Sequence, residues 1–232
     1  GVPYAVMMTT PLDLEDFVLG FSFTEGIVEH VDEFTALSFE PHPLGVRALA
    51  QLAPSAFARH LARQRNMSGR TGCGVCGIQD LDALPTARAV QGRARVSPAA
   101  LAKAVSAIER HQPLNEATRA VHAAAWFDLD GEHIASREDV GRHNALDKLI
   151  GALLRARRKP EHGFILITSR CSFEMVEKAA AFGASFMAAI SAPTSLAIER
   201  AAALGVNLAA IVREDGFTAF DLEPSSVMEA LA

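Results

Sequence analysis

The amino-acid sequence predicts an α/β protein with a smaller α+β domain over residues 1–95 and a larger α/β domain over residues 96–232. In the larger domain, short apolar runs alternate with segments whose apolar residues recur at helical spacing, which is the pattern of a layered α/β fold. In the smaller domain the patterns are shorter and mixed, which favours α+β structure. A polar, arginine-bearing stretch over residues 83–96 separates the two and is typical of a linker.

The smaller domain begins with a predicted helix near residues 11–25, where Leu14, Val18 and Phe21 share one face after a Thr10-Pro11 start signal. Residues 29–43 and 45–52 are predicted strands, with a turn at residues 41–43, and residues 53–65 a short helix. Residues 66–77 are rich in glycine and contain Cys73 and Cys76. Glycines at this density are incompatible with a packed helix or strand, so we expect a loop that presents two thiols.

The larger domain begins with a helix that starts at Ser97-Pro98 and carries Leu101, Val105 and Ile108 on one face. A strand over residues 123–129 ends at the Asp130-Gly131 turn, and a helix carries the apolar stripe of Leu146, Leu149, Ile150 and Leu153. The remaining pattern predicts strands over residues 164–168, 185–191 and 206–212, with helices over residues 173–182 and 193–204 between them.

Composition and charge exclude several classes of protein. With 50% apolar and 21% charged residues the chain is globular rather than disordered or collagen-like. A net charge of -5 lacks the basic excess of proteins that bind nucleic-acid polymers, and no apolar stretch is long enough to span a membrane. Three cysteines, an odd number, indicate a reducing compartment, and we expect the cytoplasm. The first ten residues lack the features of a signal peptide. They resemble the middle of a β-strand rather than its beginning, as we expect for an N-terminally trimmed chain.

Cys73 and Cys76 form a CxxC motif, which suits half a zinc site, a redox dithiol or a thiolate that carries sulfur. A zinc site would need Cys171 and a distant histidine as further ligands, and a thioredoxin-like dithiol would lie at a helix start rather than among glycines. In the third interpretation, Arg70 favours the anionic form of a nucleophilic thiol. The spacing alone leaves all three open. No histidine is followed by glutamate two residues later, which argues against zinc deaminase chemistry.

Polar side chains also gather where predicted strands end. Asp139, Arg142, His143 and Asn144 lie at a predicted helix N-terminus, which favours anionic ligands, although Asp139 as a cap and Arg142 as an ion-pair partner are the simpler alternative. Ser169 and Arg170 follow a strand, and the alternative there is a capped helix with Cys171 as a buried apolar residue. Residues 191–195 and 212–217 follow the next two strands. Together these strand ends could line one cleft for phosphates and a nucleotide base, without a Walker or GxGxxG motif.

Four blocks of sequence, in this order, resemble one family. They are Gly69 to Gly77 (GRTGCGVCG), Arg137 to Gly151 (REDVGRHNALDKLIG), Thr168 to Val176 and Ser191 to Thr194. The family is that of the formate dehydrogenase accessory sulfurtransferases, the FdhD type. The resemblance implies that the C-terminal domain has a three-layer fold similar to that of cytidine deaminases, and that the protein is a homodimer.

The resemblance also implies a function. The family receives sulfur from a cysteine desulfurase as a persulfide and delivers it to the bis-molybdopterin guanine dinucleotide molybdenum cofactor, which formate dehydrogenase requires. By position, Cys73 would carry the persulfide with Cys76 as its partner. GDP is an analogue of the guanine nucleotide part of this cofactor. That part would contact Ile211, Val212, Arg213, Glu214, Asp215 and Gly216. The same cleft would also be lined by Asp139, Arg142, His143 and Asn144, with Ser169 and Arg170 at the neighbouring strand end.

Two alternatives to a sulfurtransferase remain: a non-catalytic chaperone that binds and inserts the molybdenum cofactor, and a zinc-stabilised binding protein. The chain also departs from the family pattern at two places. The family reads TGGVH where this chain has Thr118 to His122, so Arg119 and Ala120 replace two glycines. Gly216 stands where a second basic residue is common, which leaves Arg213 as the only arginine of that stretch.

Overall fold

The computed structural model describes residues 2–64 and 87–220. The helices of these residues are α1 (Leu14–Thr24), α2 (Pro54–Gln64), α3 (Pro98–Ile108), α4 (Pro113–Thr118), α5 (Arg142–Arg155), α6 (Phe173–Phe182) and α7 (Ser195–Leu204). The strands are β1 (Phe34–His42), β2 (Gly45–Leu52), β3 (His122–Asp128), β4 (His133–Asp139), β5 (Gly163–Ile167), β6 (Phe186–Ala189), β7 (Asn207–Arg213) and β8 (Gly216–Phe220).

The main sheet has the strand order β4-β3-β5-β6-β7-β8. Strands β5, β6 and β7 are parallel to one another, and every other neighbouring pair is antiparallel. The parallel strands are joined by α6 and α7, as expected because parallel neighbours need a crossover connection. The sequence-based prediction of an α/β domain is therefore confirmed.

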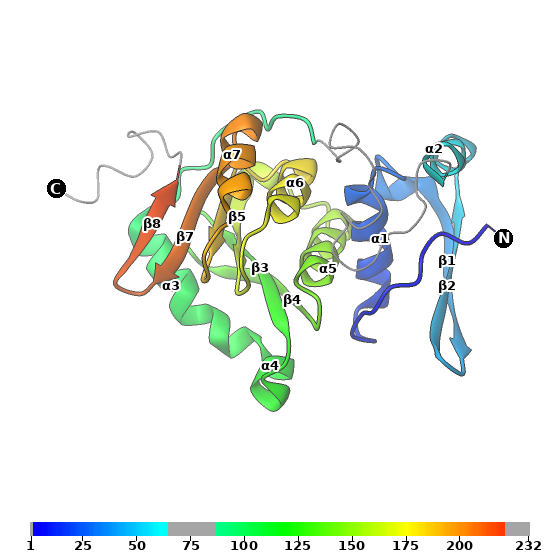
Figure 1. Ribbon diagram of the computed structural model, residues 1–232, viewed down its shortest axis with the longest axis horizontal. Helices are drawn as coiled ribbons and strands as arrows, with labels where there is room; N and C mark the ends of the chain where they lie inside the picture. The colour runs from blue at the N-terminus through cyan, green and yellow to red at the C-terminus, as the bar shows by residue number, and fades with distance from the viewer. Residues whose placement is uncertain (1, 65–86, 221–232) are drawn as a thin grey trace.

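Helices cover both faces of this sheet (Figure 1). On one face, Ile165 and Ile167 of β5 pack in a core with α5, α6 and α7. On the other face, Phe164 and Leu166 pack in a second core with α3. Successive side chains of a strand point to opposite faces, so a short run of apolar residues is buried on both sides.

The smaller β1–β2 hairpin lies apart from the main sheet and projects from the body of the molecule (Figure 1). A small core of Ile27, Val28 and Ala56 anchors its base. Helix α1 instead packs against α5, and the two backbones come so close that a Cβ on Gly20 would overlap the Asp147 carbonyl oxygen. The domain boundary at residue 95 stays a prediction, and α1 is the part of the N-terminal segment that packs on the larger domain.

Several boundaries differ from the sequence-based prediction. Helix α1 begins at Leu14, because Asp13 has left-handed backbone angles and the Thr10 side chain and backbone are used in tertiary hydrogen bonds. The predicted strand over residues 29–43 begins at Phe34, after a short 3-10 turn over Val31–Glu33. Strand β4, helix α4 and strand β8 were not predicted. Strand β4 is only partly buried along most of its length, α4 is a six-residue helix, and β8 is largely exposed and lacks an apolar run. None of the described helices is long and apolar enough to cross a membrane.

Candidate functional site

The predicted site residues that the structure describes gather at one edge of the main sheet. The parallel strands β5, β6 and β7 all end there, and antiparallel β3 begins there, since Ala124 pairs with Ile167. Strand β4 ends at the same edge because Asp139 pairs with His122. Ligands of α/β sheets bind outside the carboxyl ends of parallel strands, so this edge is the candidate site.

Asp139 and Asn144 hold the N-terminal segment against this edge. The fully buried Asp139 carboxylate pairs with Lys148 at 2.7 Å and accepts hydrogen bonds from the Thr9 hydroxyl at 2.6 Å and the Thr10 amide at 2.9 Å. Asn144 donates to the Met8 carbonyl at 2.7 Å and to Asp139 at 3.0 Å. Because these groups already have protein partners, the structure gives them a positioning role.

The ionisation of Asp139 follows from these contacts. Burial by itself would raise the pKa of the carboxyl, but the hydrogen bonds from Lys148, Thr9 and the Gly141 amide, together with the Lys148 charge, outweigh it. The pKa of Asp139 therefore lies below its ordinary value, and the carboxylate stays charged at neutral pH.

Arg142 and its neighbours, by contrast, carry buried polar atoms that lack partners. Within the described residues, Arg142 Nε, Ser172 Oγ and Glu174 Oε2 are buried without a hydrogen bond. No described acidic side chain forms an ion pair with Arg142, so the simpler interpretation of Arg142 as an ion-pair partner finds no support there. Buried polar groups without partners are rare in native proteins, and a bound ligand is one of the few explanations.

His122 lies close enough to Arg142 and Arg170 for their charges to act on it. Burial lowers the pKa of His122, and the positive charges of Arg142 and Arg170 lower it further. The imidazole therefore stays neutral at neutral pH beside two arginines. Ser169 is buried and its hydroxyl donates to the Arg170 carbonyl at 3.0 Å, whereas the Arg170 residue is exposed.

The end of β7 has an unusual backbone. Ile211 has a φ of 55°, in the left-handed region that β-branched residues avoid, and its side chain is half exposed. The Arg213 guanidinium is folded back and donates to the Ile190 carbonyl at 2.6 Å and to the Val212 carbonyl at 2.8 Å. Val212 is buried, whereas Glu214, Asp215 and Gly216 are exposed. Strained backbone of this kind clusters at ligand sites because surrounding structure must hold it.

The loops after β5, β6 and β7 are joined to one another. Cys171 forms an isolated parallel bridge with Pro193, and the Cys171 amide donates to the Ala192 carbonyl at 3.2 Å. The Ile211 amide donates to the Ser191 carbonyl at 3.3 Å. These contacts place the three loops next to one another at the edge of the sheet. The rim of the candidate site is therefore formed by Arg170, Glu174 and the Ile211–Gly216 stretch.

The cysteines differ sharply in what they can do. Cys73 and Cys76 lie outside the described residues. Cys171 is fully buried, as in the apolar interpretation of this residue. Burial raises the pKa of the Cys171 thiol to about 12, the Glu174 charge adds to the shift, and Arg142 opposes it. Cys171 is therefore protonated at neutral pH and is a poor nucleophile.

No group of three or more metal-ligating side chains is found among residues 2–64 and 87–220.

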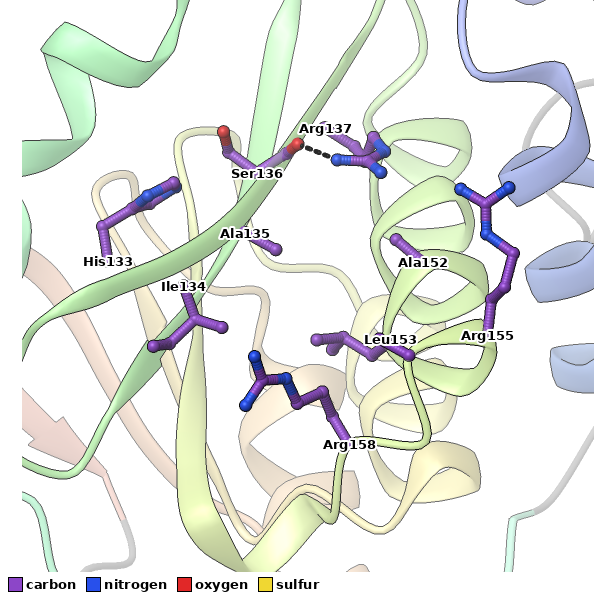
Figure 2. Close-up of a pocket in the computed structure, with 10 residues that line it drawn as sticks. His133, Ile134, Ala135, Ser136, Arg137, Ala152, Leu153, Arg155 and Arg158 are labelled. Atoms are coloured by element: carbon purple, nitrogen blue, oxygen red, sulfur yellow. Dashed lines mark hydrogen bonds between the residues drawn. The ribbon is translucent and has the colours of Figure 1, made fainter.

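A separate groove lies at the opposite end of β4 (Figure 2). It has a volume of about 520 Å³ and runs between His133–Arg137 of β4 and the last turns of α5, with Arg155 and Arg158 on its wall. Arg137 and Arg155 are paired with Asp16, at 2.6 Å and 2.8 Å. None of the predicted site residues lines this groove, so it is distinct from the candidate site.

Comparisons with known proteins agree with the sequence blocks. A protein from Xanthomonas axonopodis pv. citri (strain 306) called "Sulfur carrier protein FdhD" is 48% identical over 215 residues, which covers 92% of this chain and 76% of the relative. A protein of the same name from Bordetella petrii is 45% identical over 214 residues, which covers 92% of this chain and 77% of the relative.

A solved structure supports the fold. The crystal structure of a protein assigned as a formate dehydrogenase accessory protein, from Desulfotalea psychrophila, matches with a TM-score of 0.71 and 24% identity, over 94% of this chain and 82% of that one. At this identity the likeness concerns the fold alone. The family model of the FdhD/NarQ family matches residues 1–224. The chain therefore belongs to the FdhD/NarQ family.

Proposed function

We propose that this protein is a cytoplasmic sulfurtransferase that supports the maturation of formate dehydrogenase. Cys73 accepts sulfur from the persulfide of a cysteine desulfurase, with Cys76 as its partner in the motif. The sulfur is then passed to the bis-molybdopterin guanine dinucleotide molybdenum cofactor, which is the substrate. The scaffold for this reaction is the α/β domain, for which we propose the layering of cytidine deaminases.

The observation that carries this proposal is the state of Cys171. Sulfur is accepted by a thiolate, and Cys171 is fully buried with a pKa of about 12. The sequence contains three cysteines, so the two of the CxxC motif are the thiols left for the reaction. The relatives named as sulfur carriers support the same assignment.

The path of the chain supports transfer between the CxxC motif and the candidate site. The Ala87 amide donates to Glu177 Oε2 at 2.6 Å, and Glu177 also pairs with Arg200. Glu177 lies one helical turn after Glu174 on α6, a distance of about 5 Å along the helix axis. The hydrogen bond to Glu177 therefore fixes the backbone at Ala87 close to the candidate site. Cys76 precedes Ala87 by 11 residues, a length that spans at most about 40 Å.

The nucleotide part of the cofactor is proposed to bind along the rim of Arg142, His143, Ser169, Arg170 and the Ile211–Gly216 stretch. Arg142 lies in the first turn of α5, and Ser172 is the residue directly before α6, where its side chain makes no capping hydrogen bond; two helix N-termini therefore face this edge. Helix N-termini and arginines both favour the phosphate groups of a dinucleotide.

Mass spectrometry of the intact protein, after incubation with a cysteine desulfurase and cysteine, tests the proposal. We expect an adduct of one sulfur atom that peptide mapping places on Cys73 and that reductant removes. Cys73→Ala should abolish the adduct, while Cys171→Ala should retain it. An adduct on Cys171, or none on any cysteine, would overturn the sulfurtransferase assignment. If GDP still bound, the non-catalytic chaperone would then be the better description.

We also propose a homodimer, and the β1–β2 hairpin supports it. An isolated two-stranded hairpin is marginally stable in water, and this one exposes Phe39, Leu44, Val46 and Leu49. Burial of these side chains against a second copy would stabilise the hairpin. Size-exclusion chromatography with light scattering should give the mass of a dimer, and Val46→Glu should shift it toward the monomer. A wild-type monomer at micromolar concentration would contradict the proposal.

A further inference from the structure

Glu174 has a carboxylate that no part of the proposed function explains. It lies in the first turn of α6, directly after the loop that joins β5 to this helix. Its Oε2 is buried and has no hydrogen-bond partner among the described residues. The nearby Ser172 Oγ and Arg142 Nε share this condition. A buried polar atom without a partner destabilises the protein, more so when it is charged, and a ligand that hydrogen-bonds to it would relieve this cost.

The charges around Glu174 restrict what this ligand can present. The charges of Arg142 and Glu174 both act on the buried Cys171 thiol, with opposite sign, so a cation and an anion lie close to the same residue. The arginines at this edge suit phosphate groups. A carboxylate repels phosphate and only accepts hydrogen bonds, so Glu174 suits N–H or O–H donors from a part of the ligand other than its phosphates.

We infer that Glu174 is the residue that selects guanine. This inference rests on the proposed function, in which a guanine nucleotide binds at this edge. Guanine presents N1–H and the exocyclic N2 amino group side by side, and the two oxygens of a carboxylate accept from both. Adenine presents an acceptor nitrogen beside its amino group, which would place a lone pair against a carboxylate oxygen. Base edges of nucleotides outside a duplex are read by hydrogen bonds in this way.

The same arrangement determines the direction in which the nucleotide lies in the site. The base lies toward Glu174 on α6, and the diphosphate lies toward Arg142 and Arg170. Ser172, whose hydroxyl has no described partner, lies between these groups in the loop and is available to the ribose or a phosphate oxygen. In the loop after β6, the Ala192 carbonyl accepts from the Cys171 amide and the Ser191 carbonyl accepts from the Ile211 amide. This loop and the end of β7 therefore lie beside the start of α6, and we place them along the base.

Isothermal titration calorimetry of the full chain with GDP, IDP and ADP tests this inference. IDP has the same ribose and diphosphate as GDP and the base N1–H, but lacks the N2 amino group. We expect wild-type protein to bind GDP at least about tenfold more tightly than IDP, and ADP the most weakly, because a missing donor leaves a carboxylate oxygen unpaired. Equal affinity for GDP and IDP in the wild type would overturn the inference without any variant.

Glu174→Gln replaces one acceptor with a donor at nearly constant shape. We expect GDP affinity to fall by about 10- to 100-fold, which is the range for hydrogen bonds to a charged group, while ADP affinity changes little. Glu199→Gln is the matched control, because Glu199 is an exposed residue of α7. A similar melting temperature of the two variants would show that both are folded.

Two other outcomes are distinguishable. If Glu174→Gln weakens GDP and ADP equally, the carboxylate contacts the ribose or supports the loop, and the inference is wrong. If wild-type protein binds none of the three nucleotides, the nucleotide site of the proposed function itself fails.

Discussion

At the scale of single residues, Arg119 explains one departure from the family pattern. It ends α4 with a φ of 53°, in the left-handed region, and its amide donates to the Asn115 carbonyl at 2.8 Å. The family has glycine there, and glycine adopts this conformation without a Cβ clash. The neighbouring Ala120 does not have a positive φ. Of these two positions, only the first therefore has a backbone conformation that favours glycine.

Arg119→Gly should raise the free energy of unfolding by about 1 kcal/mol, because it removes the strain of a left-handed non-glycine residue. Ala120→Gly should instead lower it by up to about 1 kcal/mol, since it only increases the freedom of the unfolded chain. Urea denaturation followed by circular dichroism measures both. A loss of stability in Arg119→Gly would show that the arginine side chain makes a compensating interaction.

Gly216 is the second departure, and its backbone does not require glycine. Its φ is not in the left-handed region, and a Cβ at this position would meet no atom within 4 Å. The space for a basic side chain is therefore open at the β7–β8 turn.

Gly216→Arg should tighten GDP binding about fivefold at low salt, because it adds an exposed cation, worth roughly 1 kcal/mol, to a loop that borders the proposed site of an anionic nucleotide. The gain should shrink as salt screens it. Gly216→Gln adds a side chain without charge and should leave GDP affinity unchanged. Calorimetric titrations at two salt concentrations make the comparison. Equal gains for arginine and glutamine would assign the effect to contact rather than charge.

At the scale of elements, the α1–α5 pair is held together by two glycines. A Cβ on Gly20 would overlap the Asp147 carbonyl, and a Cβ on Gly151 would overlap the Asp16 carbonyl. This contact brings the buried Asp147–Lys178 pair, at 2.8 Å, within reach of Thr24, whose hydroxyl donates to Asp147 at 2.7 Å. Close helix packing thus ties α1, α5 and α6 together.

Gly151→Ala and Gly20→Ala test this packing through the sign of their effect. Helix propensity alone predicts a gain of about 1 kcal/mol for glycine to alanine in a helix interior. The overlap predicts instead a loss of about 1–3 kcal/mol. Chemical denaturation gives the answer, and a gain in either variant would contradict the close approach.

At the scale of the whole molecule, the Asp139–Lys148 pair attaches the N-terminal segment to the sheet. Both side chains are fully buried, and Lys148 also donates to the Thr10 carbonyl at 2.8 Å. The pKa of Asp139 is lowered in the folded state. Its contribution to stability is therefore fully present above the ordinary value of 3.8, and it is lost as the pH falls through the lower folded-state pKa.

Asp139→Asn should destabilise the protein at neutral pH by about 3–5 kcal/mol, because it leaves the buried Lys148 charge without a counter-charge. Its stability should also fall less steeply than that of the wild type below about pH 4. Asp32→Asn breaks the exposed pair with Arg157 and should change stability by less than about 1 kcal/mol. Denaturation midpoints from pH 2 to 7 provide the test, and parallel pH profiles of wild type and Asp139→Asn would contradict it.

The elements of the α/β domain could be predicted from the sequence wherever burial is complete. The five residues of β5 are all buried, so an unbroken apolar run identified this strand, and the apolar face of α5 repeats at helical spacing, which identified the helix. Strand β8 and helix α4 escaped prediction because an exposed strand and a six-residue helix leave little hydrophobic pattern. The predicted cleft residues were recognisable because polar groups followed buried strands directly.

The sequence by itself determined the family, the CxxC thiols and the strand ends that gather polar residues, because these depend on residue identity and local order. Only the tertiary structure decided which of these polar groups are already partnered. Asp139 and Asn144 are occupied by the N-terminal segment, whereas Arg142, Ser172 and Glu174 retain buried atoms without described partners. The physical reason is that hydrogen bonding between Thr9 and Asp139, 130 residues apart, depends on the packing of whole elements and leaves no local signal in the sequence.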